Sequence, residues 1–254
     1  KMIRTLKAEV NLPADVAMPR HIAVIMDGNN RWAKKRFLPS LAGHKAGVKS
    51  VRSVIEGCVE LGVESVSLFA FSTENWKRPA LEVKGLMELF GIALDRETKK
   101  LHKNNIRLVV IGDKSRFSDS LQKRIYDAEQ LTKENDGLIV NVAANYGGQW
   151  DIVSAAKRFA QECISGKCLP EDLNESLFNQ YVSLADQAKP DLCIRTGGES
   201  RISNFLVWQM AYTEYHFVDC LWPDFNKQHL LEAIRDFAGR ERRFGRTSEQ
   251  LEEK

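Results

Sequence analysis

Short runs of apolar residues, bounded by polar turns, recur along the chain and predict its strands. Within each run the apolar residues are nearly continuous and do not alternate strictly with polar ones. Continuous runs are typical of strands that are covered on both faces, as in parallel sheets. The sequence therefore predicts a buried, mainly parallel sheet with strands at 22–26, 65–72, 106–111, 138–144, 191–195 and 215–221.

The segments between these runs show the spacing of helices. Between positions 48 and 59, for example, apolar residues recur every three or four positions, which is close to the helical period. Further helices are expected near 81–101, 115–134, 148–165, 171–182 and 226–241. Alternating strands and helices indicate an α/β fold with right-handed crossovers, which we interpret as one domain.

Four of the predicted strands are followed by polar segments that could bind a ligand. These segments are DGNNRW, FSTENWKRP, NYGGQW and RTGGESRISN, after the first, second, fourth and fifth runs. Parallel strands bring their carboxyl ends to one edge of the sheet, where open α/β folds bind ligands. We therefore expect one site that is assembled from several strand ends.

Composition and charge narrow the class of protein. The chain has 254 residues, 43% of them hydrophobic, and a formal net charge of +3, which is far below the basic stripe of a nucleic-acid-binding domain. Its five cysteines form no C-x-x-C pair, so we expect reduced thiols packed in a cytoplasmic protein. No apolar run approaches a membrane span, and the first twenty residues lack the apolar core of a signal peptide, so we expect at most peripheral membrane contact.

The chemistry of the predicted edge suits a polyanion. Arg31, Arg78, Arg195 and Arg201 lie there, with His44 at the start of the following helix. Arginine binds carboxylate and phosphate oxygens with paired hydrogen bonds, and glycines let backbone N–H groups approach an anion. Further donors are expected from Gly28, Asn29, Ser72, Gly197, Gly198 and Ser203. This many cations around few acids favours two anionic groups over one.

Asp27 is the exception among these cations, and its role has two readings. It could be a salt-bridge partner or a helix cap, or it could hold Mg²⁺ together with substrate phosphates, as carboxylates commonly do. Glu214 is a possible second carboxylate. Other phosphate motifs are excluded: GHKAGVKS at 43–50 lacks the spacing of a P-loop, and neither G-x-G-x-x-G nor G-x-S-x-G supports another site. Trp32 and Trp76 could be core residues or could line an apolar channel for the ligand's tail.

The sequence resembles the cis-prenyltransferases. The resemblance rests on HIAVIMDGNNRWAKKR, AGHKAG, LFAFSTENWKRP, NVAANYGGQWDIV, DLCIRTGGESRISNFLVWQMAYTEYHF and LWPDF, which occur in family order across residues 20–245. It implies a catalytic domain over 20–245 with a mainly parallel six-stranded sheet, a partly flexible segment at 1–19 and a tail at 246–254. It also implies Mg²⁺-dependent condensation of isopentenyl diphosphate onto farnesyl diphosphate in cis geometry. The bacterial members are homodimers that make undecaprenyl diphosphate, the precursor of the lipid carrier for cell-wall sugars.

The resemblance also assigns roles to residues. Asp27 would hold Mg²⁺ with Glu214 and position the departing diphosphate, and Asn75 is the family's proposed proton acceptor, although an amide is a poor base. Leu138 would form the floor of the tunnel, and RRFG at 242–245 would reach the partner subunit's site. The residues that would bind the two diphosphates and organise the reacting ends are Gly28, Asn29, Asn30, Arg31, Trp32, His44, Ser72, Thr73, Glu74, Trp76, Arg78, Arg195, Arg201, Ile202 and Ser203.

One departure from the family pattern concerns a phosphate contact, because Ser40 stands where an arginine is common. Arg36 or Lys35 could reach in instead.

Three other functions are less well supported by the sequence. A non-catalytic partner subunit would be expected to lack the aspartate and the arginines, a trans-type prenyltransferase needs D-D-x-x-D pairs that this chain does not have, and only the polyanion argument supports a nucleic-acid module.

Overall fold

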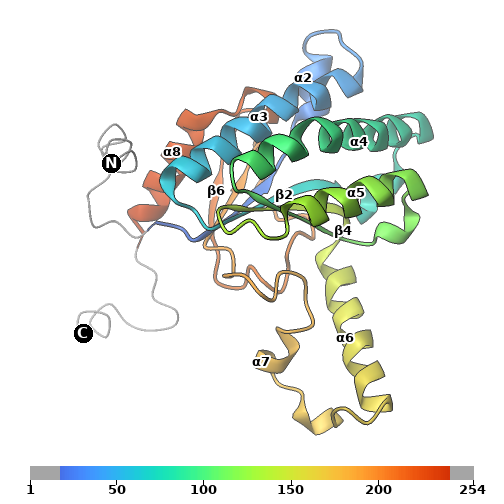
Figure 1. Ribbon diagram of the computed structural model, residues 1–254. Coiled ribbons are helices and arrows are strands. Elements are labelled where there is room, and N and C mark those ends of the chain that lie inside the picture. Colours follow the sequence, from blue (N-terminus) through green and yellow to red (C-terminus); the bar gives the residue numbers. More distant parts are fainter. Residues whose placement is uncertain (1–17, 241–254) are drawn as a thin grey trace.

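A six-stranded sheet forms the centre of the computed structural model, which describes residues 18–240. Every strand pairing is parallel, and the strand order is β3-β4-β2-β1-β5-β6 (Figure 1). The strands are β1 (His21–Ile25), β2 (Ser65–Ser72), β3 (Arg107–Ile111), β4 (Ile139–Tyr146), β5 (Leu192–Arg195) and β6 (Glu214–Phe217). The predicted α/β class and the position of each strand are confirmed. Most of the predicted N-terminal segment at 1–19, the predicted tail at 246–254 and RRFG at 242–245 lie outside the described residues.

The helices also follow the sequence pattern, with one exception. They are α2 (Asn29–Lys34), α3 (Ser40–Leu61), α4 (Ala80–Lys103), α5 (Asp119–Thr132), α6 (Gly148–Ile164), α7 (Glu175–Phe178) and α8 (Lys227–Ala238), with 3₁₀ turns η1 (Thr73–Lys77), η2 (Lys114–Arg116), η3 (Pro170–Asp172) and η4 (Trp222–Asp224). The helix predicted at 171–182 is wrong, because only η3 and the single turn α7 form there. Asn174 caps a new turn by accepting a hydrogen bond from the Leu177 N–H, which separates the two pieces.

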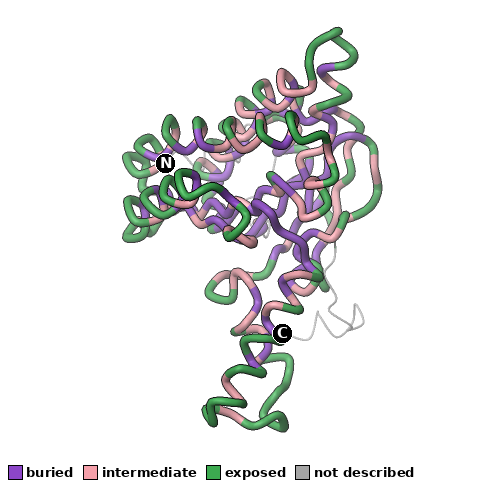
Figure 2. The backbone as a smooth tube through the Cα atoms, turned by 90° about the vertical axis from the view of Figure 1, so that its right-hand side faces the viewer, coloured by how far each residue is buried: buried purple, intermediate pink, exposed green. Residues whose placement is uncertain are grey.

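The two faces of the sheet are covered differently. On one face, α3, α4, α5 and α8 enclose the larger apolar cluster, which contains Val24, Leu68, Leu108, Leu230 and Ile234. The other face packs against the loops that follow β5 and the start of α6, and α6 and α7 extend away from the sheet on that side (Figure 1). Figure 2 shows the buried segments gathered at the sheet and the exposed residues along the outer helices. Among the helices that the structure describes, none is long and apolar enough to cross a bilayer.

Candidate active site

A cavity of about 880 Å³ opens at the carboxyl ends of β1, β2 and β5, which is where the parallel sheet predicts a site. Its walls come from the polar segments that follow those strands and from the facing sides of α3 and α4. Most of the site residues proposed from the sequence line it, so segments far apart in the chain meet here. They are Asp27, Gly28, Asn29, Asn30, Arg31, His44, Ser72, Glu74, Asn75, Arg78, Arg195, Arg201 and Ser203.

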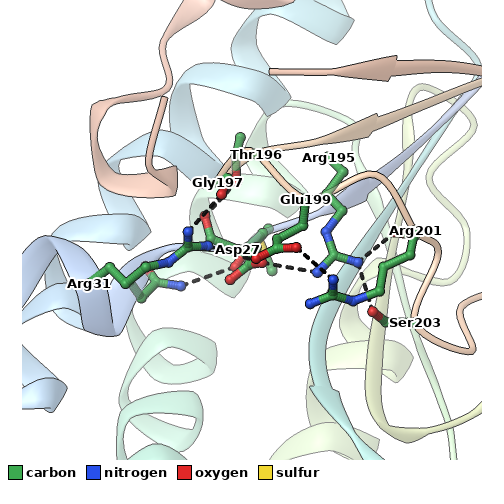
Figure 3. Close-up of polar contacts among 10 residues, drawn as sticks. Asp27, Arg31, Arg195, Thr196, Gly197, Glu199, Arg201 and Ser203 are labelled. Atoms are coloured by element: carbon green, nitrogen blue, oxygen red, sulfur yellow. Dashed lines mark hydrogen bonds and ion pairs between the residues drawn. The ribbon is translucent and has the colours of Figure 1, made fainter. Parts of the chain in front are cut away.

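Asp27 lies between two arginines at the mouth of this cavity (Figure 3). One carboxylate oxygen, Oδ2, is 3.0 Å from Arg195 Nη2 and 3.2 Å from Arg31 Nη2. The Arg195 side chain is only 5% exposed, whereas that of Asp27 is 31% exposed. The Asp27 carboxylate therefore offsets the buried charge of Arg195 and remains accessible to a ligand. The salt-bridge reading and the metal-binding reading of Asp27 are thus compatible.

Further polar contacts fix the orientation of these guanidinium groups. Arg195 Nη1 donates to Ser203 Oγ at 2.7 Å and to the carbonyl oxygen of Arg201, and Arg31 Nη1 donates to the carbonyl of Gly197 at 2.7 Å (Figure 3). Arg201 itself pairs with Glu199 at 2.6 Å and is exposed at the rim. The arginines are held in place before any ligand arrives, which limits the entropy that is lost on binding an anion.

Two glycines permit this close arrangement. Gly28 adopts a φ of 109° and Gly197 a φ of 89°, a region that side chains with a Cβ rarely occupy. A Cβ on Gly197 would lie 2.5 Å from the Arg31 guanidinium, and one on Gly28 would lie 2.8 Å from Leu221. Each turn therefore needs glycine both for its backbone conformation and for its packing.

The segment that superficially resembles a P-loop is instead a packing surface of α3. A Cβ on Gly43 would lie 1.9 Å from the Asn29 carbonyl oxygen, and one on Gly47 would lie 2.7 Å from Trp222 Cδ1. The Trp222 indole N–H also donates to the Gly47 carbonyl at 3.0 Å. These glycines let α2 and η4 approach α3 closely, and this approach places the start of α2 at the cavity.

Several polar atoms in the cavity wall have no protein partner. Among the described residues, the buried Asn29 Oδ1, His44 Nε2 and Arg195 Nε form no hydrogen bond. Burial, together with the nearby charge of Arg78, lowers the pKa of His44 to about 4, and Glu82 opposes this shift only in part. His44 is therefore a neutral imidazole at pH 7. Buried polar groups are nearly always paired, so these three unpartnered atoms are exceptional, and all three belong to residues that line the cavity.

Asn75 organises the turn η1 with its side chain. Its Oδ1 accepts a hydrogen bond from the Ser72 backbone N–H at 3.0 Å, as half of a capping box. The oxygen that a proton acceptor would use is thus already engaged. Close by, Glu74 accepts a hydrogen bond from Asn204 Nδ2 at 3.2 Å. Burial would raise the pKa of Glu74, but its hydrogen bonds, including this one, lower it overall.

The polar cavity continues into an apolar one of about 450 Å³ between α3, α4 and the sheet. The two cavities share the side chains of Met26, Val48, Val51, Ala70, Phe90 and Ala93. Strand residues Leu108, Val140 and Val142 line the far part. Leu138 does not line the cavity itself, but it lies two positions before Val140 and is buried in the adjoining core. The molecule thus offers an arginine-lined head site joined to an apolar tunnel.

Four of the proposed substrate-binding residues do not line either part of this site. The Trp76 indole N–H donates to Asn145 Oδ1 at 2.7 Å, and its ring packs against Phe71. The Trp32 indole N–H donates to Asp224 at 2.8 Å. Ile202 packs in the apolar cluster on the other face of the sheet, and Thr73 lies beside Gly147. Trp76 packs against the core, as one of the two readings expected, whereas Trp32 is half-buried under Arg36 and belongs to none of the apolar clusters among the described residues.

Asp27 and Glu214, the two carboxylates that were expected to hold the metal, lie at opposite ends of the strands within one chain. Glu214 is the first residue of β6 and pairs in register with Leu192, the first residue of β5, whereas Asp27 lies two residues beyond the last residue of β1. The length of a strand therefore separates the two carboxylates. Glu214 accepts a hydrogen bond from Arg240 at 3.0 Å instead. Among the described residues, no group of three His, Cys, Asp or Glu side chains is placed to hold a metal.

Ser40 is not compensated by a neighbouring cation. Its hydroxyl lies 3.4 Å from Glu82 Oε1, and Arg36 stacks over Trp32 with its guanidinium carbon 3.9 Å from the ring centroid. Arg36 and Lys35 are both exposed, and neither lines the cavity in this structure. Sequence reasoning also missed Asn204, which lines the cavity next to Ser203 and has a φ of 64°. Asn204 directly follows Ser203 in the sequence, and this position next to a predicted site residue is the signal that could have identified it.

Comparisons with known proteins agree with this geometry. A profile of the family described as "Putative undecaprenyl diphosphate synthase" matches residues 25–245. The chain is 58% identical to the ditrans,polycis-undecaprenyl-diphosphate synthase ((2E,6E)-farnesyl-diphosphate specific) of Pseudomonas putida, covering 94% of this chain and 95% of the relative. The chain belongs to this family. It is therefore an enzyme of the cis-prenyltransferase class.

Further relatives extend the agreement from sequence to structure. The chain is 54% identical to the enzyme of the same name from Vibrio cholerae, covering 95% of this chain and 96% of the relative. The crystal structure of lavandulyl diphosphate synthase from Lavandula x intermedia in complex with dimethylallyl diphosphate matches with a TM-score of 0.87 at 37% identity, covering 90% of this chain and 98% of that one. A probable undecaprenyl diphosphate synthase from Campylobacter jejuni matches with a TM-score of 0.76 at 39% identity, covering 91% and 100%.

Proposed function

We propose that this enzyme condenses isopentenyl diphosphate units onto farnesyl diphosphate in cis geometry and makes undecaprenyl diphosphate. One observation carries the proposal: a cavity lined by arginines opens directly into an apolar tunnel. This pair of features suits a substrate with a diphosphate head and a growing hydrocarbon tail. The names of the relatives supply the primer and the product.

In the proposed reaction, the chain's own residues hold the two diphosphates and keep water out. His44, with Asn29 and Arg31 at the start of α2, would bind the allylic diphosphate, and Arg195, Arg201 and Ser203 the isopentenyl diphosphate. As the allylic carbon–oxygen bond breaks, the departing diphosphate gains negative charge, which fixed guanidinium groups stabilise. The apolar tunnel shields the cation-like carbon and encloses the growing tail.

Asp27 is the proposed ligand for Mg²⁺. A carboxylate that is partly exposed among phosphate-binding groups suits this ion, which usually takes one or two carboxylates and completes its shell with phosphate oxygens and water. When bound, the ion would neutralise charge on the leaving diphosphate. The absence of a carboxylate cluster in the described residues fits a metal that is held partly by substrate.

Asn75 is proposed to position the reacting ends and not to accept the proton. Its Oδ1 holds the Ser72 N–H, and this contact fixes the turn that carries Glu74 into the cavity. The proton that leaves when the new carbon–carbon bond forms would pass to the departing diphosphate or to water. If Asn75→Asp, which keeps the accepting oxygen and is a far stronger base, turns over no faster than wild type while Asn75→Ala is far slower than both, the positioning role is supported; a faster Asn75→Asp enzyme would instead support proton acceptance.

We further propose that the enzyme works as a homodimer. The strand β6 ends the sheet, and an edge strand presents unpaired backbone groups to a partner. Phe217 on this strand is 40% exposed. Light scattering should give twice the chain mass of 28.8 kDa, whereas the single-chain mass at micromolar concentration would contradict the proposal.

A product assay distinguishes the proposed enzyme from a non-catalytic partner subunit. Incubation with farnesyl diphosphate, labelled isopentenyl diphosphate and Mg²⁺ should give a ladder that ends in a long polyprenyl diphosphate. Folded protein that binds both diphosphates but incorporates no label would support the subunit reading. The retained Asp27 and arginines argue against that outcome.

A further inference from the structure

An exposed loop between α2 and α3 combines basic and large apolar side chains. We call residues 34–38, with the sequence KKRFL, the basic loop; it comprises the last residue of α2 and the four residues that follow. All five residues are exposed, and the loop projects from the helical layer at the top of Figure 1. Phe37 is 98% exposed, which is unusual for an aromatic side chain, and Leu38 beside it is 43% exposed.

The backbone of this loop is hydrogen-bonded and is strained at Phe37, which makes the exposure of that side chain informative. The Leu38 N–H donates to the Ala33 carbonyl at 3.0 Å, and the Phe37 N–H donates to the Lys34 carbonyl at 3.1 Å. This is the hydrogen-bond pattern of a Schellman motif, in which glycine usually occupies the left-handed position. Here Phe37 occupies that position with a φ of 55°. A bulky residue is strained there and gains no packing in the fold, so its place calls for a partner outside the chain.

The surroundings of the loop define that partner. Lys34 and Lys35 form no ion pair with any residue that the structure describes, whereas Arg36, half exposed over Trp32, lies 3.7 Å from an Asp224 carboxylate oxygen. A second exposed apolar side chain, Leu81 at 86%, lies at the start of α4. The two helix starts adjoin, because Ser40 approaches Glu82 at 3.4 Å. Clustered cations around exposed apolar tips are the pattern of a surface that binds anionic lipid.

The same rim borders the active-site cavity. His44, one turn after Ser40, lines the cavity, and so does Arg78, which pairs with Glu82 at 3.2 Å. We propose that the basic loop, together with Leu81, docks the enzyme on an anionic lipid bilayer with the mouth of the cavity beside the membrane. A long apolar product could then leave the tunnel without crossing water. This role of the loop deepens the proposed function and rests on it, whereas the docking itself can be measured without any substrate.

The test is sedimentation of the full chain with vesicles of phosphatidylglycerol and phosphatidylcholine, compared with phosphatidylcholine alone. Wild-type protein should bind the anionic vesicles, and binding should weaken as salt is raised. Replacing both Lys34 and Lys35 by Gln should weaken binding about fivefold per charge, or about twenty-five-fold together. The matched control is Ile164→Ser, which removes a side chain that is 80% exposed at the end of α6 and should change nothing.

Phe37→Gly separates docking from a structural role. Glycine relieves the left-handed strain, so the melting temperature should stay the same or rise, while vesicle binding falls at least about tenfold with the loss of the buried ring. Turnover in detergent should stay within about twofold, because Phe37 does not line the cavity. The proposal is overturned if wild-type protein does not bind anionic vesicles, or if Phe37→Gly binds them normally. It is also overturned if Phe37→Gly alters only the mass of the assembly, because the loop would then contact a second copy.

Discussion

Replacing Gly43 by alanine tests how the structure places the phosphate-binding end of α2. The added Cβ would lie 1.9 Å from the Asn29 carbonyl oxygen, whereas ordinary contact begins at 3.4 Å, so α2 and α3 must separate by about 1.5 Å. A backbone carbonyl has no alternative rotamer, so the overpacking cost should reach the upper end of the usual range, about 3 kcal/mol. Alanine's better helix propensity returns about 1 kcal/mol. The free energy of unfolding should therefore fall by about 2 kcal/mol.

Two assays check this prediction. The melting temperature should fall by about 4–8 °C, since a domain of this size loses about 2–4 °C per kcal/mol. Turnover should fall about a hundredfold, because Asn29 and Arg31 move by about an ångström relative to Arg195. The matched control is Gly239→Ala at the end of α8, where the nearest atom, the Asp236 carbonyl oxygen, is 3.6 Å away and φ is −80°. A Gly43→Ala enzyme as stable and as active as wild type would refute the close approach of α2 and α3.

Three further predictions follow from burial and from the shape of the tunnel. Burial lowers the pKa of both His21 and His44 to about 4, so the unfolded chain binds protons before the folded chain does as pH falls. The free energy of unfolding, measured by urea titration, should therefore be highest above about pH 6.5 and fall by a few kcal/mol toward pH 4. A free energy of unfolding that does not change with pH in this range would contradict the prediction. Ala93→Phe fills the junction of the two cavities and should shorten the products, with initial condensation retained; an unchanged ladder would place the growing chain elsewhere. Leu138→Ala should lower stability by about 2–5 kcal/mol and lengthen the products, because it opens the wall behind Val140, and unchanged product length would show that Leu138 does not close the tunnel.

The sheet could be predicted because each strand is a continuous apolar run with both faces covered. The run at 22–26 differs from β1 by a single residue at each end, and the parallel arrangement then places the segments after β1, β2 and β5 at one edge. That topological consequence, together with residue type, was enough to assemble Asp27, Arg31 and Arg195 in one site.

What the sequence did not predict depends on tertiary contacts. Whether Trp76 faces the cavity or the core is decided by Asn145, which lies far along the chain and accepts its N–H. The separation of Glu214 from Asp27 depends on which end of β6 it occupies, and sequence distance carries no such information. The helix expected at 171–182 had suitable apolar spacing, but the cap at Asn174 restarts the chain after η3.

The most direct test of the central claim is the Mg²⁺ dependence of chain elongation in wild type and in Asp27→Asn. The variant keeps an oxygen that can accept from Arg195 and Arg31, so it should fold normally, yet it lacks the charge that a metal ion needs. We expect wild-type elongation that rises with Mg²⁺ and stops with chelator, and a variant whose turnover is at least about a hundredfold lower at every Mg²⁺ concentration. Normal elongation by folded Asp27→Asn protein, or wild-type elongation indifferent to chelator, would contradict the assignment of Asp27 as the carboxylate that positions the departing diphosphate.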